Sequence, residues 1–243
     1  AKVVIARNVM PHVSELLDVM TGIELILSKD GVLVIEFHDA ARIQTELHYD
    51  SIYHEHLCYY SIQSMIYLLK KFDLIPFHIE KSPISGGSWV IYSSKKSRGP
   101  SAALDKAILD ENENMVNSLT SWLEFAKRVK RHRQQTLQIL NTLNGKNILG
   151  FGASARSQTY LNYCGIDKEW VVAIIDNSPL KHNLFAPGSS IPIVGFNEGM
   201  EMNPDIIFVL AWNFRDEIIS QCKSYGYKGQ FLVPFPNTPH IIN

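Results

Sequence analysis

The stretch Asn147-Ile148-Leu149-Gly150-Phe151-Gly152 decides the fold of the second half of the chain. Its apolar run predicts a buried strand, and its two glycines predict a tight turn at the end of that strand. Residues 155–164 then have the pattern of a helix, and the apolar run at residues 171–176 predicts another strand. A strand, a glycine-rich turn, a helix and a second strand are typical of a parallel sheet with helical crossovers.

Three further elements continue this alternation. Residues 205–210 and 230–233 are apolar strand candidates, and residues 214–225 between them predict a helix. Together with the first three elements, they predict a small Rossmann-like domain over residues 145–243.

The first half of the chain predicts a different sheet. Residues 2–9 and 31–37 are continuous apolar runs, typical of buried parallel strands, and a helix capped by Ser14 is predicted between them. This order implies a right-handed parallel crossover. A polar segment at 38–61 follows, and then come a helix near 62–73, two strands at 75–81 and 87–94 that form an antiparallel hairpin, and mostly helical residues at 103–143.

The fold class predicted from these patterns is α/β with three parts. They are a sheet domain at residues 1–98, a helical connector at 99–144, and a Rossmann-like domain at 145–243. The chain opens directly on a strand and without an initiator Met, so we expect the natural protein to extend further toward its N-terminus.

Composition excludes several classes of function. The formal charge of −1 over 243 residues argues against a nucleic-acid surface, and the chain lacks the run of about 18 apolar residues that a membrane span needs. Cys58, Cys164 and Cys222 are odd in number and widely spaced, which predicts reduced thiols rather than disulfides. These features predict a cytoplasmic protein that does not bind a membrane.

Two turns fall at the carboxyl ends of predicted strands, where open parallel sheets bind their ligands. The first spans residues 7–12 and ends at His12, which is either a core histidine or a site residue. The second spans residues 150–156, where backbone amides and a helix N-terminus favour a phosphate. A plain tight turn is the alternative for the second, because Ala155 replaces the third glycine of the dinucleotide fingerprint.

The segment Asp50-Ser51-Ile52-Tyr53-His54-Glu55-His56 has the composition of a catalytic site. It places two imidazoles, a carboxylate and a phenol within a few residues, which suits proton transfer. His54 and His56 could instead chelate a metal, but the spacing of the zinc-protease motif is missing, so proton transfer is favoured and no metal is expected.

Several separated motifs resemble one family. They are ARNVMPHV at residues 6–13, DSIYHEHLCYYS at 50–61, GGSWVIY at 86–92, GFGASARSQTYLNYCGI at 150–166, DNSPLKHNLFAPGSSIPI at 176–193 and LAWN at 210–213. In this order they are similar to the sugar C-methyltransferases, which depend on S-adenosylmethionine and act on nucleotide-linked deoxysugars. The resemblance implies a zinc-binding N-terminal segment, a class I methyltransferase domain and a C-terminal Rossmann-like domain. Residues 1–98 would then be the second half of the methyltransferase sheet.

The resemblance also implies a reaction. A base removes the proton alpha to the ketone of a 4-keto sugar, and the resulting enolate takes the methyl group at carbon 3. The implied site residues fall into three groups. The catalytic group is His56 as the base with Tyr53, Glu55 and His12; the cofactor group is Arg7 and Asn8; and the group for the nucleotide-linked sugar is Ser154, Arg156, Lys181, Asn213, Gly87 and Ser88.

Two other functions stay open on the sequence. Residues 150–176 could form a nicotinamide-dinucleotide site with Asp176 on the ribose, which would make the protein an oxidoreductase. Alternatively, the chain could bind a nucleotide sugar without catalysis. Because the resemblance places the glycine-rich cofactor loop before residue 1, the isolated chain is expected to be inactive.

Overall fold

The computed structural model describes residues 1–243, except for the side chain of Ser85. The chain forms two compact units. Residues 1–45 and 54–124 make up the first unit, and residues 46–53 and 125–243 make up the second.

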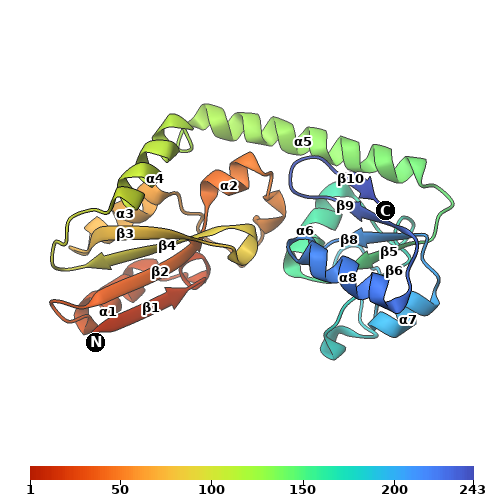
Figure 1. The fold of residues 1–243 in the computed structure, drawn as a ribbon, viewed down its shortest axis with the longest axis horizontal. Coiled ribbons are helices and arrows are strands. Elements are labelled where there is room, and N and C mark those ends of the chain that lie inside the picture. Colours follow the sequence, from red (N-terminus) through yellow and green to blue (C-terminus); the bar gives the residue numbers. More distant parts are fainter. The chain divides into compact units, whose positions relative to one another are not determined.

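The first unit is built on a four-stranded mixed sheet in the order β1-β2-β4-β3 (Figure 1). Its strands are β1 (Val3–Arg7), β2 (Val32–His38), β3 (Ile75–Ser82) and β4 (Ser88–Ser94). β1 and β2 are parallel and are joined through α1 (Leu16–Ile26), whereas β4 is antiparallel to both β2 and β3. The predicted parallel crossover and the antiparallel hairpin are confirmed.

Helices pack on one face of this sheet. Besides α1, the unit contains α2 (Ala40–Thr45), α3 (Ile62–Lys70), α4 (Ala102–Glu113) and the short 3-10 helices η1 (Met10–His12) and η3 (Ile84–Gly86). The core joins Leu33, Ile35 and Phe37 of β2 to apolar side chains of α1, α3 and α4. Burial of this shared face is the main source of the unit's stability.

The N-terminus of α3 shows how polar residues support this packing. The Ser61 hydroxyl accepts a hydrogen bond from the Ser64 amide, and the Ser64 hydroxyl accepts one from the Ser61 amide. The buried Glu111 carboxylate accepts two more, from the amides of Ile62 at 2.6 Å and Gln63 at 3.0 Å. A negative charge at this end also complements the dipole of α3.

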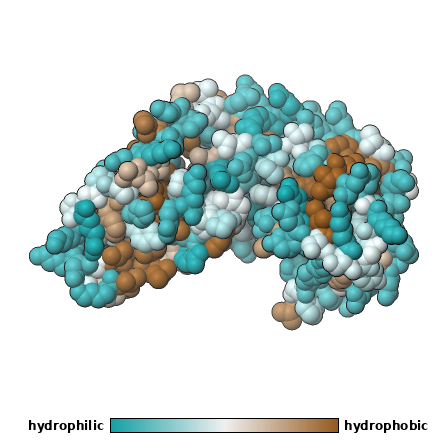
Figure 2. Space-filling view, in the orientation of Figure 1, coloured by the Kyte–Doolittle hydropathy of each residue, from teal (hydrophilic) through white to brown (hydrophobic). Residues whose placement is uncertain are grey.

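One prediction for the first unit is wrong. Residues 2–9 were expected to form a fully buried strand, but Val3 and Ile5 of β1 are 56% and 62% exposed. Side chains alternate between the two faces of a strand, and Val4 and Ala6 pack in the core, so Val3 and Ile5 lie on the face of β1 turned away from that core. Figure 2 shows apolar residues gathered on the surface where β1 and α1 lie. Leu17 and Leu25 of α1 are also exposed.

The second unit is built on a six-stranded sheet in the order β10-β9-β8-β5-β6-β7. Its strands are β5 (Ile148–Phe151), β6 (Ala173–Ile175), β7 (Ile193–Val194), β8 (Ile206–Val209), β9 (Gln230–Val233) and β10 (His240–Ile242). All neighbouring strands are parallel except β9 and β10. This arrangement confirms the Rossmann-like prediction, although β7 and β10 were not predicted.

Helices cover both faces of this second sheet. They are α5 (Leu119–Thr142), α6 (Ala155–Cys164), α7 (Phe196–Glu201) and α8 (Arg215–Tyr225), with η2 (Tyr49–Ser51), η4 (Pro179–Lys181) and η5 (Trp212–Phe214) as short 3-10 helices. Met200 of α7 and Cys222 of α8 pack in one core with Val209. On the other face, Tyr160 of α6 contacts the Phe208 ring and hydrogen-bonds Thr136 of α5.

The structure departs from the predicted organisation in four places. α2 and η2 lie inside the polar segment 38–61, for which no helix was predicted, and Ser14 does not cap α1, whose N-cap residue is Glu15 without a side-chain hydrogen bond. The expected connector at 99–144 is divided, because α4 belongs to the first unit and α5 belongs to the second from residue 125 onward. Residues 46–53 also pack in the second unit, although the flanking segments belong to the first.

Candidate active site

The turn after β1 holds His12 at the carboxyl end of the first sheet. Asn8 adopts a left-handed φ of 50° and donates its amide to the Glu36 carbonyl of β2 at 3.1 Å, which ends β1. The next residues, Met10 and Pro11, are buried in η1. Because the proline ring fixes its own φ, it favours the short helical turn that presents His12 to solvent.

The loop after Tyr53 is bound to η1 through backbone contacts. The amides of Leu57 and Cys58 both donate to the Pro11 carbonyl, at 2.7 Å and 3.3 Å. The Tyr60 hydroxyl donates to the Met10 carbonyl at 3.3 Å. These bonds hold the histidine-rich loop against the turn that carries His12, so the structure brings together two motifs that are about 40 residues apart.

Two imidazole rings meet at this point. The ring centroids of His12 and His56 are 4.8 Å apart at an edge-on angle of 63°, and the Tyr59 ring lies 6.1 Å from that of His56. Nδ1 of His12 is 2.9 Å from the Glu55 carbonyl oxygen. Since a carbonyl only accepts hydrogen bonds, Nδ1 carries the proton, and the Nε2 atom of a neutral His12 is free of a proton. The pair therefore offers an unprotonated imidazole nitrogen for proton transfer.

The other predicted catalytic residues are placed differently. Glu55 is exposed and reaches His12 through its backbone carbonyl, so its described contact there does not involve the carboxylate. Tyr53 is half-buried and is the last residue of the segment that packs in the second unit. The structure thus unites His12, His56 and the Glu55 backbone, and the roles of the Tyr53 phenol and the Glu55 carboxylate stay predictions.

Arg7 and Asn8, the residues expected at the cofactor, lie beside a carboxylate that sequence reasoning missed. Nε of Arg7 donates to Oε2 of Glu36 at 2.6 Å, and the Glu36 side chain is fully buried. The other oxygen, Oε1, is buried without a hydrogen-bond partner among the described residues. A buried, unsatisfied carboxylate oxygen is costly unless a donor or a cation reaches it. The ammonium and sulfonium groups of S-adenosylmethionine therefore fit the chemistry of this position.

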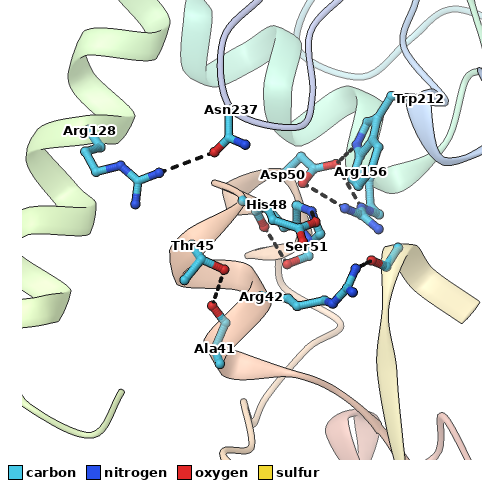
Figure 3. Close-up of polar contacts among 12 residues, drawn as sticks. Ala41, Arg42, Thr45, His48, Asp50, Ser51, Arg128, Arg156, Trp212 and Asn237 are labelled. Carbon is cyan, nitrogen blue, oxygen red and sulfur yellow. Dashed lines mark hydrogen bonds and ion pairs between the residues drawn. The ribbon is translucent and has the colours of Figure 1, made fainter. Parts of the chain in front are cut away.

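Gly87 lies in the turn between β3 and β4, and Ser88 is the first residue of β4. Gly87 has a φ of 132°, and a Cβ atom there would lie 2.3 Å from Cδ of Arg42. Figure 3 shows Arg42 donating to the Gly86 carbonyl, at 3.0 Å. The hydroxyl of the buried Ser88 donates to the Ile84 carbonyl at 3.0 Å. The glycine thus allows close approach of Arg42, and a contact of Gly87 or Ser88 with a sugar stays a prediction.

The glycine-rich turn of the second unit is paired within the chain. The Gly152 amide donates to the Ile175 carbonyl at 2.7 Å, and the Ala153 amide donates to the Asp176 carboxylate at 2.8 Å. These are the amide and carboxylate groups that a nicotinamide dinucleotide would need at its pyrophosphate and ribose. Because the Ala153 amide and the Asp176 carboxylate bind one another, and the Gly152 amide binds the Ile175 carbonyl, the geometry argues against the oxidoreductase alternative.

Asp176 is the centre of this pairing. It also accepts hydrogen bonds from the Ser178 amide at 2.8 Å and from Lys181 Nζ at 3.1 Å. Burial alone would raise the pKa of Asp176. The amides of Ser178 and Ala153 and the Lys181 ammonium outweigh it, and they hold the pKa below its ordinary value. The carboxylate therefore stays charged and holds the turn in one conformation.

The residues expected to face a phosphate also have partners inside the chain. Arg156 binds Asp50 through two hydrogen bonds, the Ser154 hydroxyl accepts from the Ser157 amide at 3.1 Å as the cap of α6, and Lys181 binds Asp176. Asn213 is exposed in η5. A phosphate-facing patch of Ser154, Arg156 and Lys181 stays a prediction.

Sequence reasoning missed Glu36, Asp50 and Trp212. Glu36 could have been found, because it is the only acidic residue in the apolar run Val32–Phe37. Asp50 begins the catalytic motif but was not separated from it, and nothing local marks Trp212 as its partner.

Cys58, Cys164 and Cys222 are free thiols, as predicted. Within residues 1–243 as described, no cluster of three or more His, Cys, Asp or Glu side chains has the arrangement of a metal site. Among those same residues, no helix has both the length and the apolar character needed to cross a membrane.

Comparisons with known proteins show the family of the chain. Residues 83–236 match the family described as "C-methyltransferase C-terminal domain". Over 248 aligned residues the chain is 27% identical to C-methyltransferase NovU of Streptomyces niveus, and the alignment covers 100% of this chain and 59% of that relative. The chain thus spans about three fifths of the length of the curated relative it matches. The family match at residues 83–236 covers more than half of the chain, so the chain belongs to the C-methyltransferase C-terminal domain family.

Proposed function

We propose that the whole protein is a C-methyltransferase that moves a methyl group from S-adenosylmethionine to the carbon alpha to the ketone of a nucleotide-linked 4-keto-deoxysugar. The observation that carries this proposal is the contact between the His12 and His56 rings, with Nδ1 of His12 on the Glu55 carbonyl. Removal of a proton alpha to a ketone needs a base near neutral pH and a group that stabilises the enolate oxygen, and two adjacent imidazoles can supply both.

In this proposal His56 is the base. A neutral imidazole has one ring nitrogen without a proton, and that nitrogen can take the alpha proton. His12 then acts at the ketone oxygen. Its Nδ1–H is held by the Glu55 carbonyl, so only Nε2 can face the substrate, and it donates there when the ring carries a second proton. Tyr53 would orient the sugar or relay the proton.

S-adenosylmethionine would supply the electrophilic methyl group. Arg7 and Asn8 lie on the proposed cofactor side of the sheet edge, and Glu36 adds the buried carboxylate oxygen that lacks a partner among the described residues. The role of these three residues would be to bind and orient the cation. The family assignment supports this choice of donor.

Six residues are proposed as contacts of the sugar nucleotide, and each group is considered within its own unit. They are Gly87 and Ser88 in the first unit, and Ser154, Arg156, Lys181 and Asn213 in the second. A lysine has three donor hydrogens, and Lys181 uses two of them on Ala153 and Asp176 at 3.0 Å and 3.1 Å, which leaves one for a phosphate oxygen. The free thiols agree with a cytoplasmic location, which stays part of the proposal.

The test is exchange of the alpha proton with deuterated water, measured by mass spectrometry in the full-length protein. The wild type should exchange the proton of a dTDP-linked 4-keto-deoxysugar and transfer a labelled methyl group to carbon. His56→Ala should lower both rates together, by about a hundredfold to ten-thousandfold, since both need the same enolate. Full exchange in His56→Ala would move the base to His12 or Tyr53. A wild type with neither exchange nor methyl transfer on any 4-keto sugar nucleotide would end the proposal.

A further inference from the structure

The hairpin turn Gly86–Gly87 between β3 and β4 is held by residues that follow β2. Nη1 of Arg42 donates to the Gly86 carbonyl at 3.0 Å (Figure 3). The Asp39 amide donates to the Gly87 carbonyl at 3.4 Å. Both carbonyls of the glycine pair are therefore bound by the segment around the start of α2, and all four residues belong to the first unit.

The glycine pair lets the Arg42 side chain lie against the backbone of the hairpin turn. Gly86 and Gly87 have φ values of 87° and 132°, in the region that favours glycine. A Cβ atom at Gly87 would lie 2.7 Å from Nε and 2.8 Å from Nη1 of Arg42. Arg42 thus fills the space that a side chain at residue 87 would need.

The hairpin turn lies at the ligand-binding edge of the first sheet. His38, the last residue of β2, pairs with Ser88, the first residue of β4. Because β1 and β2 are parallel, their carboxyl ends lie at the same edge, and η1 with His12 follows β1 there. A substrate bound at His12 therefore lies at the edge that carries the hairpin turn.

The segment that holds the hairpin turn also contacts the histidine-rich loop. The Ala40 amide donates to the Tyr60 carbonyl at 3.1 Å, and the Tyr60 hydroxyl donates to the Met10 carbonyl of η1 at 3.3 Å. Residues 39–42 thus connect the hairpin turn to the end of that loop and to η1, through hydrogen bonds inside the first unit.

We propose that Arg42 is a positioning residue for the hairpin turn Gly86–Gly87 and sets how this turn receives the sugar nucleotide. The inference rests on the proposed function, in which Gly87 and Ser88 contact the substrate. Arg42 acts through the turn, whereas proton removal belongs to the histidine pair. Loss of Arg42 should therefore raise KM for the sugar nucleotide more than it lowers the rate of alpha-proton exchange at saturating substrate.

The test measures KM and the saturated exchange rate in the full-length protein, with a dTDP-linked 4-keto-deoxysugar. Arg42→Ala should raise KM by about tenfold, since the loss of one hydrogen bond from a charged donor is worth about that factor. The saturated exchange rate should stay within about threefold of the wild type. Arg42→Met keeps the unbranched stem but has no donor for the Gly86 carbonyl, so it should raise KM in the same way.

Gly87→Ala tests the contact between Arg42 and the hairpin turn directly. It should raise KM by itself, because its methyl group would displace Arg42 and because alanine is strained at a φ of 132°. With alanine also at residue 42, the methyl group has room. The double variant should then raise KM less than the product of the two single effects, by about threefold or more. Single effects that simply multiply would overturn the proposal.

Arg98→Ala is the matched control. Arg98 also donates to a backbone carbonyl of the first unit, that of Asp30 at 2.9 Å, but Asp30 precedes β2 and lies at the opposite edge of the sheet. This variant should keep KM within about twofold of the wild type.

Two outcomes separate this inference from the proposed function. An active wild type with an unchanged KM in folded Arg42→Ala, or a saturated exchange rate that falls as far as kcat/KM, would contradict the positioning role alone. If Arg42→Ala does not fold, Arg42→Met decides by the same criterion. A wild type that exchanges no alpha proton would contradict both the proposed function and the role of Arg42.

Discussion

Nδ1 of His12 lies 2.9 Å from the Glu55 carbonyl oxygen, one residue before His56. This bond joins the turn after β1 to the histidine-rich loop, and it sets which nitrogen of His12 carries the proton. One hydrogen bond thus determines both the position of the loop and the chemical form of its neighbouring imidazole.

His12→Asn should separate these two effects. The asparagine Nδ2 can replace Nδ1 as a donor to the Glu55 carbonyl, but asparagine has no equivalent of Nε2. We expect the melting temperature to stay close to that of the wild type, while methyl transfer falls by about a hundredfold or more. His12→Ala, which loses both groups, is the control and should also destabilise the loop. Wild-type activity in His12→Asn would leave His12 a purely structural role.

Asp176 gives a prediction for stability against pH. The pKa of Asp176 in the folded protein lies below its ordinary value. The charged carboxylate therefore adds to the free energy of unfolding above an unfolded pKa of about 3.9, and this contribution is lost as the pH falls through the folded pKa. Asp176→Asn should cost about 1–3 kcal/mol of unfolding free energy at pH 7, because amides of the turn lose a charged acceptor. Urea unfolding from pH 7 to pH 3 should show this difference shrinking toward the acid end. A constant difference would mean that the charge does not stabilise the turn.

The longer strands of both sheets, and the crossovers between them, could be predicted from sequence because they depend on local apolar runs. The helix at 155–164 agrees with α6 at both ends, since Ser154 caps it and Gly165 ends it in a left-handed conformation. β7 and β10 were missed because two or three residues carry no periodic signal. The exposure of β1 could not be predicted, because an apolar run does not reveal whether a neighbour covers both of its sides.

The candidate site was predictable in its residue types but less so in its pairing. The motif at 50–56 identified the histidines, yet the ring contact between His12 and His56 depends on backbone bonds to Pro11. Arg156 was expected to bind a phosphate because it follows a glycine-rich turn. Its pairing with Asp50 spans 106 residues, and local patterns do not encode a contact at that distance.

Glu36→Gln should weaken cofactor binding if the buried Oε1 receives a cation. The amide keeps the shape of the side chain but not its charge, so the affinity of the full-length protein for S-adenosylhomocysteine should fall by roughly fivefold to a hundredfold. Isothermal titration calorimetry measures this without catalysis. Glu80→Gln, at an exposed strand position on β3, is the control and should leave the affinity unchanged. Equal affinities for all three proteins would remove Glu36 from the cofactor site.

Arg156→Lys tests whether this arginine serves the fold, the nucleotide or both. Lysine keeps the charge but cannot form the two parallel hydrogen bonds to Asp50, so we expect a loss of about 1–3 kcal/mol in unfolding free energy. If Arg156 also reaches the diphosphate, calorimetry with dTDP should show weaker binding at a temperature where the variant is folded. Lost stability with unchanged affinity would assign Arg156 to Asp50 alone.

His132 should make the second unit less stable in mild acid. Its Nε2–H donates to the Pro234 carbonyl at 2.8 Å, and its Nδ1 accepts from the Tyr49 hydroxyl at 3.0 Å, so both nitrogens are used by the neutral ring. Burial lowers the pKa of His132, and the Pro234 carbonyl and the Asp50 charge oppose this only in part. At this residue the unfolded chain therefore binds more protons than the folded chain when the pH lies below the unfolded pKa of about 6.5. The free energy of unfolding then falls as the pH drops from that value toward the folded pKa.

His132→Gln keeps a donor for the Pro234 carbonyl but does not titrate. The difference in unfolding free energy between wild type and variant should narrow between pH 8 and pH 5, and a difference that does not change with pH would show that His132 does not titrate on unfolding.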